Sequence, residues 1–132
     1  MERAAVLLTS LIETGSVNPA YDPASAGEGA LAAVIGDFCD RLGCDVVYQE
    51  VLEGRSNVIA TLSGTMGGYG LVIEGHTDTV GLPSGATAPS ARRAGERIFG
   101  RGACDVKGGL AAALLALEEL AAARPAHVDV TL

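Results

Sequence analysis

The sequence contains no tryptophan, only 4% aromatic residues and few basic side chains. Nine Lys and Arg residues stand against sixteen Asp and Glu residues, which gives a formal net charge of −7 that is spread along the chain. Such sparse positive charge argues against nucleic acid and anionic membranes as partners. The hydrophobic fraction is nevertheless 48% and glycine occurs eighteen times, which indicates a packed globular protein and not a disordered one.

Long hydrophobic runs are also missing. No apolar run approaches the roughly 20 residues that cross a bilayer, so no transmembrane segment is expected. The apolar stretch from Ala4 to Ile12 is interrupted by Thr9 and Ser10 and has no cleavage site after it, which argues against a secretory signal. Cysteine occurs only three times, without the paired spacing of a zinc cluster or disulfide framework. We therefore expect reduced thiols in a cytoplasmic protein.

Hydrophobic periodicity predicts three helices and a hairpin. Apolar spacing near 3.6 residues predicts helices over 2–14 and 28–42, and a third that starts near Leu110 and stops by Arg124 because Pro125 follows. Two segments rich in β-branched residues, 45–52 and 57–63, are separated by a short turn. They predict a pair of antiparallel strands.

Two further strands are predicted from the hydrophobic pattern. Residues 71–75 begin with three apolar residues, as in a central strand buried on both faces, and residues 127–132 alternate. Residues 64–70 are interpreted as a loop between strands, and residues 81–97, with small residues and no periodicity, as a surface loop. A strand, a helix and a strand in this order predict a right-handed crossover in an α/β fold, with the chain as one domain or part of one.

The first candidate site follows the strand predicted at 71–75. Side chains alternate across a strand, so His76 and Asp78 project to the same side if the strand geometry persists past Gly75. An imidazole that donates one ring N–H to a carboxylate keeps its other nitrogen free, which is the arrangement of metal-ligating histidines. The pair therefore suggests a metal ligand and its orienting partner. The alternative is a histidine hydrogen-bonded at a strand end for structural reasons.

The second candidate site is GRGACDVKGG, residues 100–109, in which Asp105 stands before the third helix. A carboxylate after a glycine-rich turn can bridge two metal ions, and it can also be a helix N-cap. Phosphate binding is disfavoured, because the spacing matches no nucleotide motif and Asp105 would repel the phosphate. The remaining polar candidates are assigned structural roles: a solvated helix face for Glu118 and Glu119, the surface for His127 and packing for Cys104.

Several segments together resemble the N-terminal part of the co-catalytic zinc amidohydrolase family that includes acetylornithine deacetylase, succinyl-diaminopimelate desuccinylase, aminoacylase and glutamate carboxypeptidase. The matches stand in the family's order and near its spacing. They are SVNP (16–19), GEGALAAVIGDF (27–38) with LGCDV (42–46), GRSNVIATL (54–62), EGHTDTV (74–80) and GRGACDVKGGLAA (100–112). The resemblance implies an α/β fold, the N-terminal portion of a zinc-exopeptidase-like three-layer sandwich with a mixed sheet.

The resemblance also implies a chemistry. His76 would be a terminal zinc ligand, Asp78 the catalytic carboxylate that orients and polarises it, and Asp105 the carboxylate that bridges two zinc ions. Cobalt can substitute for zinc. The reaction would be hydrolysis of an amide bond in an N-acyl amino acid or small peptide by a metal-activated water. Because both residues follow structural elements that converge on one sheet edge, we expect His76 and Asp105 to approach closely enough for a single ion to lie between them. The resemblance further implies that the Asp105–Val106 peptide bond is cis. A non-catalytic α/β interaction or assembly domain is the alternative.

The sequence departs from the family pattern in three places. The segment 81–97 is short and lacks the usual aromatic and Asp-Pro elements, and Val106 stands where methionine is frequent. The family's glutamate base and its remaining ligands lie beyond the strand that contains Leu132. We therefore expect an N-terminal part that hydrolyses no amide by itself and binds zinc weakly, and whose last strand exposes an edge and an apolar face that favour self-association.

Overall fold

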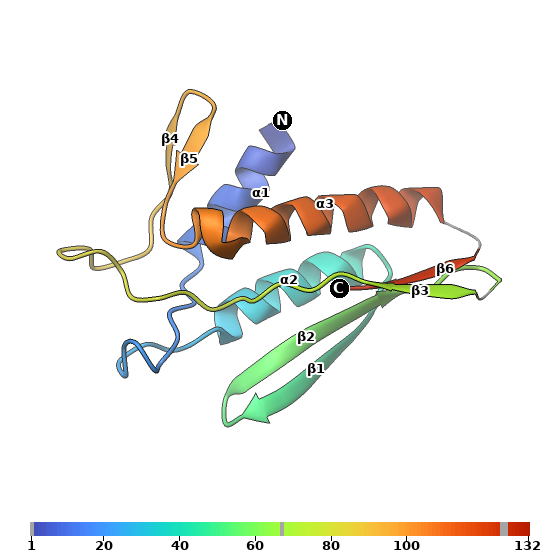
Figure 1. Cartoon of the computed structure of the whole chain (residues 1–132), viewed down its shortest axis with the longest axis horizontal. Coiled ribbons are helices and arrows are strands. Elements are labelled where there is room, and N and C mark those ends of the chain that lie inside the picture. Colours follow the sequence, from blue (N-terminus) through green and yellow to red (C-terminus); the bar gives the residue numbers. More distant parts are fainter. Residues whose placement is uncertain (1, 67, 125–126) are drawn as a thin grey trace.

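The fold is α/β, in agreement with the fold class predicted from the sequence. The computed structural model describes residues 2–66, 68–124 and 127–132. In chain order its elements are α1 (Glu2–Glu13), α2 (Gly29–Arg41), β1 (Asp45–Leu52), β2 (Arg55–Leu62), β3 (Tyr69–Val72), β4 (Arg92–Ala94), β5 (Arg97–Phe99), the π-helical turn η1 (Ala103–Lys107), α3 (Gly108–Ala123) and β6 (Val128–Thr131) (Figure 1).

A four-stranded mixed sheet has the order β1-β2-β6-β3. β1 and β2 form the predicted antiparallel hairpin, with Asp45 opposite Thr61. β6 pairs antiparallel with β2 and parallel with β3, where Leu71 lies beside Val130. The prediction that the last strand exposes an edge is therefore wrong, because β6 has a hydrogen-bonded neighbour on each side. The edges of this sheet are β1 and β3.

The strand predicted at 71–75 differs in position and in environment. β3 ends at Val72, with one further ladder bond from Ile73 N to Thr131 O of 2.8 Å. Its residues are exposed, Val72 by 72%, so the prediction of a central strand buried on both faces is wrong. Among the described residues β3 pairs with β6 alone, so it is an edge strand. The sequence did not reveal this, because an apolar run has the same composition in a central strand and in an uncovered edge strand.

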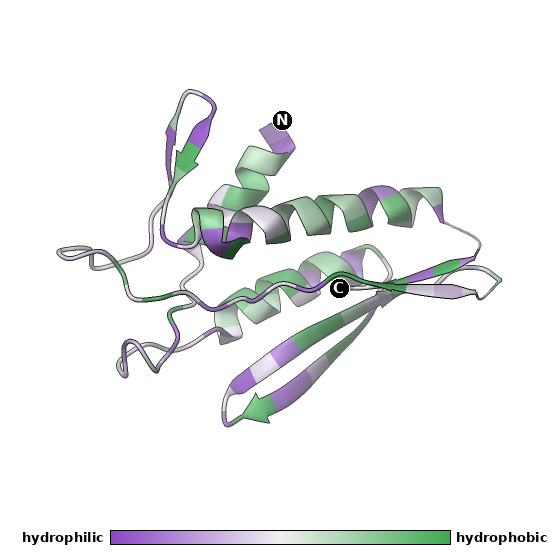
Figure 2. Ribbon diagram, viewed as in Figure 1, coloured by the Kyte–Doolittle hydropathy of each residue, from purple (hydrophilic) through white to green (hydrophobic). Residues whose placement is uncertain are grey.

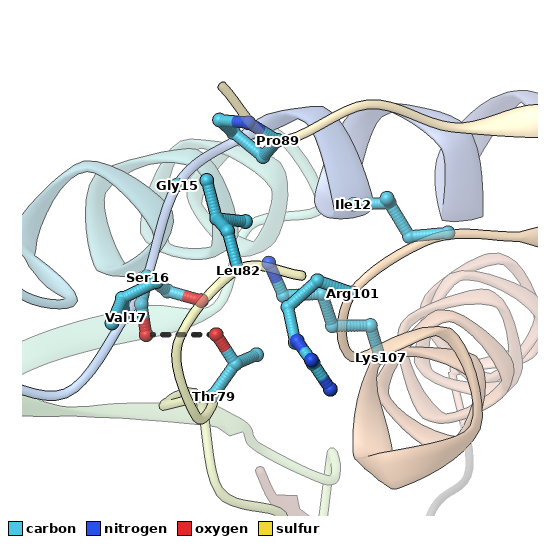
Figure 3. A pocket seen from close by; sticks show the side chains of 9 residues that line it. All are labelled: Ile12, Gly15, Ser16, Val17, Thr79, Leu82, Pro89, Arg101 and Lys107. Carbon is cyan, nitrogen blue, oxygen red and sulfur yellow. Dashed lines mark hydrogen bonds between the residues drawn. The ribbon is translucent and has the colours of Figure 1, made fainter. Parts of the chain in front are cut away.

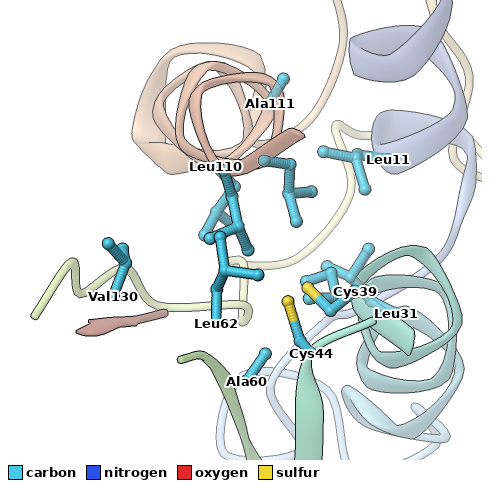
Figure 4. Close-up of a cluster of buried hydrophobic side chains, with 12 residues drawn as sticks. Leu11, Leu31, Cys39, Cys44, Ala60, Leu62, Leu110, Ala111 and Val130 are labelled. Carbon is cyan, nitrogen blue, oxygen red and sulfur yellow. The ribbon is translucent and has the colours of Figure 1, made fainter. Parts of the chain in front are cut away.

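One buried apolar cluster joins all three helices to the sheet (Figure 4). α1 contributes Leu11, α2 contributes Leu31 and α3 contributes Leu114, and these pack with Leu62 of β2 and Val130 of β6. Burial of each such side chain stabilises the fold by about 1.5–3 kcal/mol relative to exposure. α3 is hydrophobic over much of its length (Figure 2). None of the helices within the described ranges is both long and apolar enough for a membrane span.

The predicted helices agree with α1, α2 and α3 to within about two residues at each end. α3 ends at Ala123, and Arg124, with φ of 47°, donates its backbone N–H to Leu120 O at 2.8 Å. Pro125 lies outside the described residues, as does residue 67 of the loop predicted at 64–70.

The interpretation of 81–97 as an unstructured loop is wrong in its last part, because β4 and β5 pair antiparallel. Three-residue strands are too short to show a periodic pattern.

Lys107, the only lysine of the sequence, fastens η1 to α1. Its side chain is 2% exposed, and Nζ donates hydrogen bonds to Leu11 O at 2.8 Å and Thr14 O at 2.9 Å. These carbonyls lie at the C-terminal end of α1, where a helix leaves its last oxygens without intrahelical partners. Burial lowers the pKa of Lys107 to about 8. The position of η1 therefore depends on the packing of α1.

We predict that Lys107→Met lowers the free energy of unfolding by about 1–3 kcal/mol, because two carbonyl oxygens lose their donor in a site closed to water. Urea unfolding followed by circular dichroism measures the change. Arg97→Met, which alters an exposed cation on β5, is the matched control and should stay within about 0.5 kcal/mol of the unaltered chain. Equal stability of the two variants would contradict the anchoring role of Lys107.

Candidate metal site

His76 and Asp105 meet where the segment after β3 passes the turn before α3. Although they are 29 positions apart, His76 Nε2 lies 3.0 Å from Asp105 Oδ1, so the predicted close approach is confirmed. Gly75 makes the contact sterically allowed. A Cβ at Gly75 would lie 2.7 Å from Leu110 Cδ2 of α3, so a larger residue would force either the Leu110 side chain or the His76 segment to move.

Asp105 lies within η1 and does not cap α3. The N-cap position belongs to Lys107, and no side chain forms a capping hydrogen bond there. The N-cap interpretation is therefore wrong, because the π-helical turn places Asp105 before the helix start. The Asp105–Val106 peptide bond is cis, as predicted. The packing role predicted for Cys104 is wrong, since this side chain is exposed, whereas His127 is exposed as predicted.

Asp78 faces the other nitrogen of the His76 ring. Nδ1 of His76 lies 3.2 Å from Asp78 Oδ1 and 3.1 Å from the Asp78 backbone oxygen. The two side chains thus lie on the same side of the chain, as the strand alternation predicted. When Nδ1 donates its proton to Asp78, the lone pair of Nε2 is directed towards Asp105, which is the tautomer that a metal-ligating histidine requires.

The site is electrostatically biased towards a charged imidazole in the absence of an ion. The hydrogen bond to Asp105 raises the pKa of His76, the backbone hydrogen bond and charge of Asp78 act in the same direction, and partial burial opposes them. The Asp105 side chain is 86% exposed, so solvent screens its charge. A cation placed between His76 and Asp105 would replace this proton.

The two side chains fit a metal ion in kind and in spacing. An imidazole nitrogen and a carboxylate oxygen are both zinc donors, and two bonds of about 2 Å can span the 3.0 Å between Nε2 and Oδ1. Catalytic zinc uses about three protein ligands. Within residues 2–66, 68–124 and 127–132, no group of three or more His, Cys, Asp or Glu side chains is arranged to hold an ion. The described residues therefore offer part of a metal site.

Comparison with known proteins assigns this chain to a family. The model of the peptidase family M20/M25/M40 matches residues 72–132, which include His76, Asp78 and Asp105. The chain belongs to this family. Acetylornithine deacetylase of Aliivibrio fischeri is 33% identical over 83% of the chain and 29% of its own length. Succinyl-diaminopimelate desuccinylase of Burkholderia vietnamiensis is 34% identical over 96% of the chain and 33% of its own length. The chain thus spans about a third of these M20 relatives.

Solved structures of the family share the fold. A metallo-carboxypeptidase of the M20 family from Sulfolobus solfataricus superposes with a TM-score of 0.75 and 24% identity, covering 100% of this chain and 30% of its own. A tripeptidase from Staphylococcus aureus gives a TM-score of 0.73 and 21% identity, covering 98% and 35%. At these identities the likeness supports the α/β architecture with its mixed sheet.

A concavity of about 670 Å³ extends from His76 and Asp78 along the sheet. Its wall includes Arg55, whose Nε donates to Glu28 Oε2 at 2.9 Å and whose Nη2 binds Glu28 Oε1. Glu28 is 5% exposed, and its hydrogen bond raises the pKa of Arg55. Local patterns assigned these residues only to a helix start and a turn, so the sequence analysis missed an ion pair that joins the β1-β2 turn to α2.

The sequence analysis also missed Asn18, which touches the site in this M20 chain. Asn18 Nδ2 donates a hydrogen bond to Asp78 Oδ2 at 2.9 Å. The SVNP segment at 16–19 was noted only for its family resemblance. Because Asn18 and Asp78 are 60 positions apart, no spacing pattern indicated the contact.

We predict that Asp105→Asn lowers the pKa of His76 in the metal-free chain, because the main hydrogen bond to a carboxylate is lost. Titration of the ring resonances by NMR measures the shift, with the exposed His127 as internal reference. A folded pKa above the ordinary value of about 6.5 means that His76 stabilises the fold at pH below that value. This contribution is lost as the pH rises through the folded pKa. A His76 pKa that is unchanged or higher in Asp105→Asn would contradict the assignment.

Proposed function

We propose that this chain supplies two ligands and an orienting carboxylate to the zinc centre of an M20 hydrolase that cleaves an amide bond of an N-acyl amino acid or small peptide. The observation that carries the proposal is the pair formed by His76 Nε2 and Asp105 Oδ1, 3.0 Å apart, with Asp78 behind the ring. The names of the relatives support the substrate class, because one is a deacetylase and another a desuccinylase.

Each side chain has a distinct role in this proposal. His76, through Nε2, and Asp105, through its carboxylate, would hold zinc, or cobalt in its place. The chemistry that such an ion would supply is polarisation of the scissile carbonyl and activation of a water near neutral pH. Asp78 accepts a hydrogen bond from His76 Nδ1–H through its backbone oxygen at 3.1 Å, with its carboxylate Oδ1 at 3.2 Å, and so favours an unprotonated Nε2. The exposed carboxylate of Asp105 is accessible to an ion from solvent.

We further propose that the 132-residue chain does not hydrolyse amides by itself and holds zinc weakly. The support is the shortage of ligands and of a base. Two ligands leave a zinc ion open to water on its other sides. Glu118 on α3 is engaged in an ion pair with Arg3, and its neighbour Glu119 is exposed on the same helix, so neither is directed at His76.

The alternative is a non-catalytic interaction or assembly domain on the same scaffold. The observation that favours it is the exposure of apolar side chains on both edge strands, 61% for Val51 of β1 and 72% for Val72 of β3. Exposed apolar edges promote pairing with another chain. Self-association through these strands is part of the proposal under either function.

A reducing compartment such as the cytoplasm is also proposed. Cys39, Cys44 and Cys104 are all free thiols. Burial, with a smaller effect of the Cys44 charge, raises the pKa of Cys39 to about 12, and burial also raises the pKa of Cys44. A buried thiol that stays protonated is a poor nucleophile and does not exchange with disulfides.

We predict measurable but weak Co²⁺ or Zn²⁺ binding to the 132-residue chain, abolished by His76→Ala and by Asp105→Ala. Asp78→Ala should weaken binding by about 10–100-fold, since it removes the orienting partner of a ligand. Calorimetry and the visible spectrum of Co²⁺ measure the affinity. His127→Ala is the matched control, because it removes an exposed histidine far along the chain.

Equal affinity in His76→Ala and in the unaltered chain would contradict the metal assignment. The same preparations, incubated with zinc and a panel of N-acyl amino acids, should show no turnover above buffer. Turnover that is lost on chelation and in His76→Ala would instead show that the chain contains its own general base and enough ligands.

We predict that Val72→Lys shifts the chain towards the monomer in sedimentation velocity experiments, because a charge on edge strand β3 opposes strand pairing. The matched control is Val6→Lys on α1, which changes a side chain of similar exposure, 62%, away from the sheet. A monomer at every concentration for the unaltered chain would contradict self-association.

A further inference from the structure

The SVNP segment, residues 16–19, is fixed against the chain that follows His76. Val17 and Thr79 form an isolated parallel bridge. Thr79 N donates to Ser16 O and Asn18 N donates to Thr79 O, both at 2.9 Å. Ser16 is 1% exposed and Thr79 6% exposed, and Figure 3 shows Ser16, Val17 and Thr79 side by side at a small cavity. Asn18 is therefore held next to Asp78 by backbone hydrogen bonds.

The side-chain amide of Asn18 has a defined direction. Its Oδ1 accepts the backbone N–H of Ala20 at 2.9 Å, so the opposite, NH₂ end must face Asp78. The following Pro19 restricts the backbone of Asn18 to extended conformations. Both constraints come from the two residues that follow Asn18, and neither depends on Asp78. The Asn18 amide donor therefore has its orientation independently of the Asp78 carboxylate.

This donor determines which way the Asp78 carboxylate turns. Asp78 Oδ2 accepts the Asn18 Nδ2–H at 2.9 Å, which leaves Oδ1 3.2 Å from His76 Nδ1. Oδ1 thus lies beside the Asp78 backbone oxygen, which is the hydrogen-bond partner of Nδ1 at 3.1 Å. A carboxylate held at one oxygen cannot rotate freely about its terminal bond, so its second oxygen remains directed at the ring. A continuous series of contacts runs from Asn18 through Asp78 and His76 to Asp105.

We propose that Asn18 is a positioning residue of the metal site: by holding Asp78, it makes His76 carry its proton on Nδ1 and present Nε2 to the ion. This role deepens the proposed function and rests on it for the identity of the ion, whereas the contacts that carry it lie within the chain. The competing role for Asn18 is that of a turn residue whose only task is to accept the Ala20 N–H.

Two substitutions separate these roles. Asn18→Asp keeps an oxygen that can accept the Ala20 N–H but replaces the donor to Asp78 with a second carboxylate oxygen. Asn18→Ala removes both. The matched control is Asn57→Asp, which makes the same chemical change on the wall of the concavity that His76 and Asp78 line. There the Asn57 amide donates to Gln49 Oε1 at 3.3 Å, and within the described part of the chain it forms no hydrogen bond with Asp78.

The measurement is the ¹⁵N shift of both His76 ring nitrogens at a pH where the imidazole is neutral, in the metal-free 132-residue chain carrying Asp105→Ala. This background removes the carboxylate that competes for the proton at Nε2. In this parent chain most molecules should carry the proton on Nδ1. Adding Asn18→Asp or Asn18→Ala should lower that fraction at least twofold, while adding Asn57→Asp leaves it unchanged. If Asn18→Asp keeps the tautomer of the parent chain, Asn18 is only a turn residue and the proposal is overturned.

The Asp105→Ala chain also tests the proposal if either Asn18 variant fails to fold. A His76 proton found mainly on Nε2 in that chain, where no carboxylate faces Nε2, would overturn the proposal without any change at Asn18. Failure of the zinc assignment gives a different result, namely an Asn18-dependent tautomer together with no binding of Zn²⁺ or Co²⁺ to the unaltered chain. The two proposals can therefore fail separately.

Discussion

Parallel pairing of β3 with β6 is the constraint on which the candidate site depends. Parallel neighbours need a crossover, and here the crossover is α3, whose N-terminal turn must begin near the end of β3. The turn that carries Asp105 is thereby brought to the segment that carries His76. Both side chains lie beyond the carboxyl end of β3, where α/β folds generally leave a crevice. The candidate metal site thus lies at a place that the chain path creates.

The precise contact at that place depends on residues that are not ligands. Gly75 lets the His76 segment lie against α3, Lys107 fastens the Asp105 turn to α1, and Asn18 holds Asp78. Each of these contacts satisfies a steric or hydrogen-bonding requirement that would exist without a metal. Orientation of a site before its ion arrives reduces the reorganisation that binding requires.

Structural elements that depend on residues close together in the sequence could be predicted. The three helices and the β1-β2 hairpin follow from periodicity, and the approach of His76 to Asp105 follows from elements that converge on one edge of the sheet. The edge position of β3 was not predictable, because its apolar composition is the same whether or not a second strand covers it. The Asn18–Asp78 and Glu28–Arg55 contacts span 60 and 27 positions, so no local pattern reports them. The exposure of Cys104 depends on η1, a turn that hydrophobic spacing does not specify.

The burial of Lys107 has a consequence for chemical labelling. Because the only lysine of the chain is 2% exposed and its Nζ is held by two carbonyls, amine-reactive reagents do not reach this side chain as long as the fold is intact. Acylation of Lys107 then requires η1 to separate from α1. The rate at which an amine reagent modifies Lys107 therefore measures the local opening of the turn that carries Asp105.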